Sequence, residues 1–321
     1  MKPDLRTTIA GIEMASPVVV PSGTFGFGED FARFSDFSHA DIGAIFLKGT
    51  TLKPQLGNPP PRVAETPAGV LNSIGLQNPG VDVVVNEILP RLAKSGLETP
   101  LIANVAGETI DEYVAVARRF SEAPNMAAIE VNISCPNVRR GGLAFGAAPE
   151  AAFGVIKATR AVTKLPIIAK LTPNTARIVQ VARACIDAGA DALSLINTLV
   201  GMVIDVRSRR PLLGNKTGGL SGPAIKPVAV AKVYEVFDAV GHRVPLIGMG
   251  GISNADDAYE FVLAGASAVG IGTALFFNHR APREVAAGLA VRLEEAGFRR
   301  LSDAVGAAHK KRRWQTTNEI A

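Results

Sequence analysis

The stretch Leu165-Pro166-Ile167-Ile168-Ala169 carries the pattern that decides the fold, because the chain repeats it. Thr99-Pro100-Leu101-Ile102-Ala103 and Val244-Pro245-Leu246-Ile247-Gly248 are built alike, with a proline before a short apolar run. Proline suits the first residue of a strand, because its missing N–H lies outside the hydrogen-bond ladder. Stretches 188–193 and 264–269 both pass through Ala-Gly-Ala into an apolar run, as where a helix ends at glycine and a strand follows. The chain therefore repeats a strand–helix unit.

Working outward from these repeats predicts eight short strands separated by amphipathic stretches. In 176–188, for example, apolar residues recur at i, i+3, i+4, i+7 and i+8 from Ile178, which is the stripe of a helix. The predicted strands are 16–22, 43–50, 100–106, 128–134, 166–172, 192–198, 245–250 and 268–273. The predicted helices are 81–95, 109–122, 149–163, 176–188, 225–240, 254–264 and 281–297.

Eight strand-then-helix units without a linker predict an α/β protein whose residues 1–321 form one (β/α)8 TIM barrel. A doubly wound open sheet is the alternative, but no Gly-x-Gly-x-x-Gly follows the first strand. Two stretches, 53–80 and 201–222, are longer than ordinary barrel loops. We expect them to be lids or binding loops at the carboxyl ends of the strands.

Composition excludes several classes of protein. With 47% apolar and 20% charged residues, the chain is neither disordered nor collagenous. No apolar run approaches the ~18 residues of a transmembrane helix, and residues 1–6 lack the apolar region of a signal peptide. Two cysteines and four scattered histidines predict no disulfide framework and no metal site. The expected compartment is the reducing cytoplasm, with no membrane association.

The net charge of +5 comes mostly from the end of the chain. Residues 310–313 (Lys-Lys-Arg-Arg) supply four of these charges, inside a basic tail at 309–321. A nucleic-acid surface needs a patch or stripe of positive charge on the folded body. We therefore expect a solvated tail and no nucleic-acid partner.

Polar residues end most of the predicted strands, although the strands themselves are apolar. Active sites of TIM barrels lie at the carboxyl ends of the strands, so these side chains should meet at one mouth. Lysine at one strand end can be a snorkelling edge residue, but several polar residues at equivalent positions indicate a site. These residues are Ser22, Lys48, Asn104, Asn132, Lys170, Asn197 and Thr198.

Glycines after the last two strands predict a phosphate site. Gly250-Gly251 and Gly272-Thr273 occupy the turns where barrels bind phosphate on backbone N–H groups. Flavin mononucleotide (FMN) fits this prediction, because its ring can lie across the mouth. Cys135 follows the fourth strand in a loop, where nearby lysines can lower the pKa of a thiol, whereas Cys185 lies on an apolar helix face and is expected to be inert.

These motifs resemble dihydroorotate dehydrogenase from about residue 16 to about residue 298. The most specific are Asn132-Ile133-Ser134-Cys135-Pro136-Asn137, Asn72-Ser73-Ile74-Gly75-Leu76-Gln77-Asn78 and Gly218-Gly219-Leu220-Ser221-Gly222-Pro223-Ala224. Lys48-Gly49-Thr50-Thr51, Ile196-Asn197-Thr198 and Gly248-Met249-Gly250-Gly251-Ile252 add to the resemblance. Cysteine at 135 matches the soluble class 1, since the membrane-bound class 2 has serine there. The second and third motifs are most similar to class 1B.

The resemblance implies that dihydroorotate is oxidised to orotate in pyrimidine biosynthesis, with one FMN per chain. It implies a homodimer and a heterotetramer with an electron-transfer subunit that carries FAD and a 2Fe–2S cluster and passes electrons to NAD. It also implies that Cys135 is the base that removes the C5 proton and that Lys170 stabilises negative charge on the flavin. The basic tail extends beyond the usual family length, and the resemblance assigns it no role.

The resemblance assigns the remaining site residues to substrate or cofactor. The implied substrate-binding residues are Lys48, Asn72, Ser73, Ile74, Gly75, Leu76, Asn132, Asn137, Asn197 and Thr198. The implied FMN-binding residues are Ser22, Lys48, Gly49, Asn104, Asn132, Lys170, Ile196, Gly222, Gly250, Gly251, Gly272 and Thr273.

Three alternatives stay open at this point. A class 1A enzyme would reduce fumarate and need no partner subunit. Dihydropyrimidine dehydrogenase has a similar barrel, but as one domain of a much longer chain. A barrel that binds phosphate without catalysis is the third alternative, and it would be colourless when purified.

Overall fold

The computed structural model describes residues 2–29, 31, 34, 37–134 and 143–309, and its centre is a closed barrel of eight parallel strands. The strands neighbour one another in the order in which they occur along the chain. Each overlaps the range predicted for it, so the (β/α)8 barrel is confirmed and the open sheet is excluded. The strands are β3 (Val18–Val20), β4 (Ala44–Phe46), β7 (Leu101–Val105), β8 (Met126–Asn132), β9 (Ile167–Lys170), β10 (Ala192–Leu195), β15 (Leu246–Met249) and β16 (Ala268–Gly270).

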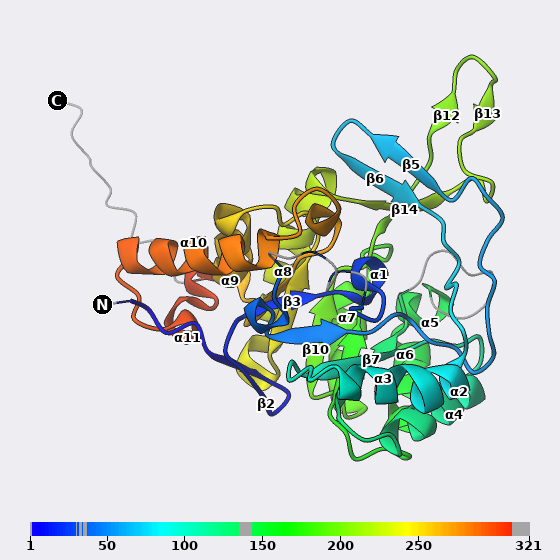
Figure 1. The fold of residues 1–321 in the computed structure, drawn as a ribbon. Coiled ribbons are helices and arrows are strands. Elements are labelled where there is room, and N and C mark those ends of the chain that lie inside the picture. Colours follow the sequence, from blue (N-terminus) through cyan, green and yellow to red (C-terminus); the bar gives the residue numbers. More distant parts are fainter. Residues whose placement is uncertain (1, 30, 32–33, 35–36, 135–142, 310–321) are drawn as a thin grey trace.

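Helices follow the strands and cover the outside of the barrel (Figure 1). Their apolar faces and the outward faces of the strands form one core, in which Val116 and Phe120 pack with Ile129. The α-helices are α1 (Ser22–Phe25), α2 (Val81–Val83), α3 (Leu89–Lys94), α4 (Ile110–Ser121), α5 (Leu143–Ala147), α6 (Pro149–Arg160), α7 (Ile178–Asp187), α8 (Lys226–Val240), α9 (Ala255–Ala264), α10 (Ala281–Glu295) and α11 (Leu301–Ala304). A π-helix, η3 (Val84–Ile88), joins α2 to α3, and the 3-10 helices are η2 (His39–Asp41), η4 (Pro223–Ile225), η5 (Gly241–Arg243), η6 (Thr273–Phe276) and η7 (Ala307–His309).

The barrel interior is a second apolar cluster, and a hairpin that the sequence pattern did not reveal packs against it. Strands β1 (Thr7–Ile9) and β2 (Ile12–Met14) pair antiparallel. Ile9 and Met14 join inward-facing residues such as Val19 and Phe46 in this cluster. Met14 lies shortly before β3, so the hairpin covers the amino-terminal end of the barrel. The interior is therefore filled there, and a site can form only at the opposite end.

The two long stretches, which we expected to be lids or binding loops, contain strands that pair with each other. β5 (Val63–Thr66) and β6 (Gly69–Asn72) come from the first stretch, and β14 (Gly218–Ser221) comes from the second. With β11 (Leu199–Gly201) they form an antiparallel sheet in the order β11-β14-β6-β5, which we call the accessory sheet. Strands β12 (Ile204–Asp205) and β13 (Arg210–Pro211) form a hairpin that projects from the barrel beside β5 and β6 (Figure 1).

Glycine allows the accessory sheet to lie tightly on the barrel. A Cβ atom on Gly219 would lie 1.9 Å from the hydroxyl of Thr198, and one on Gly218 would lie 2.5 Å from the carbonyl oxygen of Asn72. The sequence signal for these strands was weak because glycine is depleted in strands generally. In β14, glycine is needed because the backbone of the strand lies too close to Thr198 and Asn72 for any side chain to fit.

The carboxyl-terminal region returns to the barrel before the tail. The ring of His309 stacks on Tyr234 with 3.7 Å between centroids, and its Nε2 lies 3.0 Å from the carbonyl oxygen of Ala264. The rest of the predicted basic tail, residues 310–321, lies outside the described residues. Within the described ranges, no helix has the length and apolar character needed to cross a membrane.

Candidate active site

A cavity of about 590 Å³ opens at the carboxyl ends of the barrel strands and reaches the accessory sheet. Its volume lies within the range of about 300–1,000 Å³ of ligand and cofactor sites. Most residues predicted from the sequence line it. They are Ser22, Lys48, Gly49, Asn72, Ile74, Gly75, Leu76, Asn132, Lys170, Ile196, Asn197, Thr198, Gly222, Gly250, Gly251, Gly272 and Thr273.

Two predicted residues lie behind the cavity wall rather than on it. Ser73 is fully buried, and its hydroxyl accepts a hydrogen bond of 2.9 Å from Asn58. Asn104 is also fully buried, and a Cβ on Gly49 would lie 2.9 Å from its Oδ1, so Gly49 separates it from the cavity. Both residues support wall residues instead of facing a ligand. Cys135 and Asn137 lie outside the described residues.

A buried ion pair that the sequence reading missed lies beneath the mouth. Lys170, at the end of β9, and Glu130, on β8, are 4% and 0% exposed. Lys170 Nζ lies 3.7 Å from Glu130 Oε2. The carboxylate also accepts hydrogen bonds from Ser194 Oγ at 2.6 Å and from Asn104 Nδ2. The signal available in the sequence was an acidic residue inside the apolar strand 126–132, where charge is rare unless paired.

The asparagines of the mouth are held by hydrogen bonds that connect the ends of β7, β8 and β10. Asn197 Nδ2 donates to Ser134 Oγ at 2.8 Å, and Ser134 Oγ donates to Asn132 Oδ1 at 2.9 Å. Asn132 Nδ2 then donates to Asn104 Oδ1 at 3.3 Å. Tyr113 on α4 donates from its hydroxyl to the carbonyl oxygen of Asn132 at 2.7 Å. Because the network fixes the orientation of each amide, the donors and acceptors facing the cavity are preorganised.

The accessory sheet contributes the opposite side of the mouth. Asn72 pairs with Gly219 across β6 and β14, and its Nδ2 donates to the carbonyl oxygen of Gly219 at 3.2 Å. The backbone N–H of Thr198 donates to Asn197 Oδ1 at 2.8 Å, and Asn174 donates to the carbonyl oxygen of Thr198 at 2.9 Å. Asn72 and Asn197 therefore reach one cavity from different sheets.

The turn after β15, residues 250–253, begins with two glycines whose backbone conformation only glycine adopts readily; we call it the phosphate turn. Gly250 and Gly251 have φ values of +131° and +84°. A Cβ on Gly251 would lie 2.8 Å from the carbonyl oxygen of Gly222. Across the cavity mouth, Thr273 Oγ1 donates to Ser221 Oγ at 3.0 Å. Such glycine turns can bring backbone N–H groups to an anion.

The residues that line the cavity have the chemistry that a phosphate ester with a polar ring requires. Its lining combines the glycine turns with the buried lysine at the floor and amides at the side. The hydroxyl of Thr66, also on the wall, is buried and has no hydrogen-bond partner in the part of the chain that the structure describes. Sequence reading missed Thr66, because it lies in the stretch taken for a loop.

Cys185 lies away from the site, as the helical pattern predicted. It is fully buried on α7, and this burial raises the pKa of its thiol from 9.0 to about 12. The thiol is therefore protonated at ordinary pH and cannot act as a nucleophile or base. Across the described residues, no three His, Cys, Asp or Glu side chains are grouped to hold a metal ion.

Comparisons with known proteins agree on one family. A family model described as dihydroorotate dehydrogenase matches residues 4–293. The dihydroorotate dehydrogenase B (NAD(+)) catalytic subunit of Desulforudis audaxviator is 55% identical over 310 residues, covering 97% of this chain and 99% of the relative. The protein of the same description from Geobacillus sp. is 51% identical over 307 residues, covering 96% of each chain.

Among solved structures, DHODH of Eimeria tenella in complex with ferulenol matches with a TM-score of 0.80. The match covers 96% of this chain and 89% of that chain at 24% sequence identity, so it supports the fold alone.

Proposed function

Because the chain belongs to the dihydroorotate dehydrogenase family, we propose that its cavity is where dihydroorotate is oxidised to orotate. The chain is a dihydroorotate dehydrogenase of pyrimidine biosynthesis with NAD-linked electron transfer through a partner subunit. The observation that carries this assignment is the identity of 55% over nearly the full length of an NAD-linked catalytic subunit. The preorganised amides and buried lysine of the cavity support it from the structure.

The family uses a flavin, and we assign FMN to this cavity. Gly250, Gly251, Gly272 and Thr273 would hold its phosphate on backbone N–H groups. The remainder would contact Ser22, Lys48, Gly49, Asn132, Lys170, Ile196 and Gly222, and Asn104 would support Gly49 from behind the wall. When bound, the flavin supplies the acceptor for the hydride from C6 of dihydroorotate.

Lys170 would stabilise negative charge that develops at the cofactor during reaction. Its ammonium group lies at the cavity floor, and little water surrounds it because the side chain is 5% exposed. Charge stabilisation is strongest where donors are fixed and water is excluded. Glu130 holds this lysine from below, which keeps the cation in one place.

Cys135 would remove the C5 proton of dihydroorotate as a thiolate. The electrons of the C5–H bond then form the double bond of orotate as the hydride leaves C6. Asn72, Asn132, Asn137, Asn197 and Thr198 would pair the donors and acceptors of the pyrimidine ring. Lys48 would bind its carboxylate, and the segment 73–76 would cover the ring, with Ser73 supporting Ile74, Gly75 and Leu76.

We further propose that the chain forms a homodimer and, with an electron-transfer subunit, a heterotetramer. The partner would carry FAD and a 2Fe–2S cluster. The name "catalytic subunit" of the relatives supports a second subunit. This chain has only two cysteines, too few for the four thiolates that commonly hold such a cluster.

An acceptor assay tests this assignment. We expect the purified FMN-loaded chain to oxidise dihydroorotate with an artificial dye but not with NAD, and to gain NAD reduction when the electron-transfer subunit is added. Efficient reduction of NAD by the chain alone would contradict the partner requirement. Efficient reduction of fumarate would instead indicate a class 1A enzyme.

A further inference from the structure

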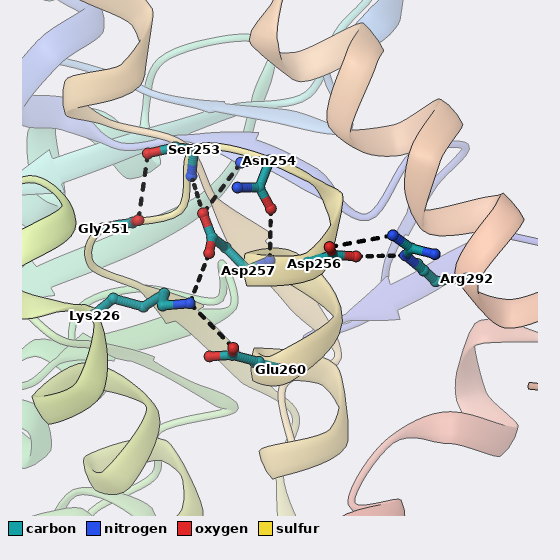
Figure 2. Close-up of polar contacts among 8 residues, drawn as sticks. All are labelled: Lys226, Gly251, Ser253, Asn254, Asp256, Asp257, Glu260 and Arg292. Carbon is teal, nitrogen blue, oxygen red and sulfur yellow. Dashed lines mark hydrogen bonds and ion pairs between the residues drawn. The ribbon is translucent and has the colours of Figure 1, made fainter.

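The start of helix α9 carries a charged cluster directly behind the phosphate turn (Figure 2). Asp257 is 8% exposed, and its Oδ2 accepts the backbone N–H groups of Ser253 at 2.9 Å and Asn254 at 3.2 Å. Asn254 returns the interaction, since its Oδ1 accepts the backbone N–H of Asp257 at 3.0 Å. This reciprocal capping box fixes the chain between the last residue of the phosphate turn and the helix.

The other oxygen of Asp257 binds a cation from a different helix. Lys226 Nζ, at the start of α8, donates to Asp257 Oδ1 at 2.7 Å and to Glu260 Oε1 at 3.1 Å. The hydrogen bond to Asp257 raises the pKa of Lys226 above its ordinary value, so the ammonium group stays charged. An uncompensated carboxylate so close to the turn would repel a bound phosphate, and Lys226 offsets that repulsion.

Lys226 also touches the turn itself. A Cβ on Gly251 would lie 2.9 Å from Lys226 Cβ and 3.0 Å from its backbone nitrogen. The ion pair therefore joins the starts of α8 and α9, and with them the glycine turns at Gly222 and Gly251, both of which line the cavity. The cluster does not itself line the cavity except through Ser253, so it acts on a ligand through the backbone.

We propose that Asp257, paired with Lys226, is a positioning residue for the phosphate group of the cofactor. Asp257 binds the N–H groups of Ser253 and Asn254, which fixes the end of the turn and with it the position of the preceding N–H groups. This inference rests on the proposed assignment of FMN to the cavity. The ligand chemistry that it specifies is the phosphate monoester, not the flavin ring.

The test compares FMN with riboflavin, which has the same ring and ribityl chain but no phosphate. Both are titrated into the cofactor-free chain, with the quenching of flavin fluorescence as the signal. The dissociation constant of riboflavin divided by that of FMN measures the contribution of the phosphate to binding. In Asp257→Asn, we expect this ratio to fall about 10-fold or more, because an aligned charged hydrogen bond is lost, while riboflavin affinity changes little.

The matched control is Asp256→Asn. Asp256 lies in the same first turn of α9, but its carboxylate pairs with Arg292 on α10, away from the phosphate turn (Figure 2). We expect its ratio to stay at the wild-type value. Lys226→Gln is the second test variant, in case Asp257→Asn does not fold, and its ratio should fall in the same direction.

The outcomes separate the inference from the assignment on which it rests. An unchanged ratio in the Asp257 and Lys226 variants, or equal weakening of FMN and riboflavin, would overturn the positioning role. A wild-type chain that binds FMN no better than riboflavin would overturn the phosphate site itself. If riboflavin binds too weakly to titrate, competition of inorganic phosphate against FMN replaces it. Phosphate should then compete with FMN in the wild type and in Asp256→Asn, and it should compete less well in Asp257→Asn. Equal competition in all three proteins would overturn the inference.

Discussion

Replacing either partner of the buried pair between Lys170 and Glu130 should reveal strong coupling in the stability of the cofactor-free chain. Lys170→Met keeps most of the side-chain volume but removes the cation, and Glu130→Gln removes the anion while keeping the shape. Nζ and Oε2 are 3.7 Å apart, and the side chains are 5% and 0% exposed. At an effective dielectric constant of about 20, this separation corresponds to an attraction of about 4–5 kcal/mol.

Each single substitution leaves one charge buried without its partner, which typically costs about 3–5 kcal/mol. Ser194 and Asn104 still donate to Glu130 in Lys170→Met, so we expect the lower part of that range there. The double variant removes both charges together. We expect its destabilisation to be about 2–4 kcal/mol smaller than the sum of the single effects, as for directly interacting groups.

Urea unfolding of the four cofactor-free proteins, at one salt concentration and near neutral pH, measures this coupling energy. Flavin is left out so that changes in cofactor affinity do not enter the unfolding free energy. Additivity to within about 0.5 kcal/mol would refute the reasoning, because it would mean that the two charges do not stabilise each other in the folded chain.

Three other results are expected. Cys135→Ala should retain FMN but lose most flavin reduction by dihydroorotate, and Cys135→Ser should be slow near neutral pH and recover as pH rises, in anaerobic stopped-flow measurements. Cys185 should resist iodoacetamide in the native chain at any pH well below its pKa of about 12, and rapid labelling of Cys185 on peptide mapping would contradict this. Because burial raises that pKa from 9.0, the contribution of the thiol to stability is full below about pH 9 and is lost as pH rises through about 12. Gly222→Ala should weaken FMN binding in fluorescence titration, because Gly222 has φ +97° and its new Cβ would lie 2.7 Å from Gly69 Cα. Gly297→Ala is the control, since Gly297 has φ +78° but its Cβ would have no atom within 4 Å. It should leave FMN affinity unchanged and lower stability by only about 1 kcal/mol.

The barrel could be predicted because its signals are local and repeated. Most barrel strands begin or end at a proline or glycine, and each buried strand is an apolar run with no need of alternation. The helix at 178–187 followed from its apolar stripe alone. The hairpin of β1 and β2 was missed because its strands, Thr-Thr-Ile and Ile-Glu-Met, mix polar and apolar residues and lack the apolar run that marks the equally short barrel strands.

The accessory sheet and the support behind the site could not be predicted, because they depend on contacts between distant parts of the chain. Gly219 indicates a loop by its residue type, yet it is a strand residue because Thr198 leaves room for nothing larger. Ser73 belongs to a site motif and Asn104 to a strand end, but both are buried behind the cavity wall, and neither signal specifies which side a residue faces. Glu130 was overlooked because its partner Lys170 is 40 residues away in sequence.

The central claim is that the cavity at the barrel mouth oxidises dihydroorotate with a bound flavin. The most direct measurement is anaerobic mixing of the purified FMN-loaded chain with one equivalent of dihydroorotate, while flavin absorbance is recorded and orotate is quantified. We expect the flavin absorbance to bleach, with one orotate formed per flavin reduced. A chain that retains FMN, remains folded and neither bleaches nor forms orotate would contradict the claim.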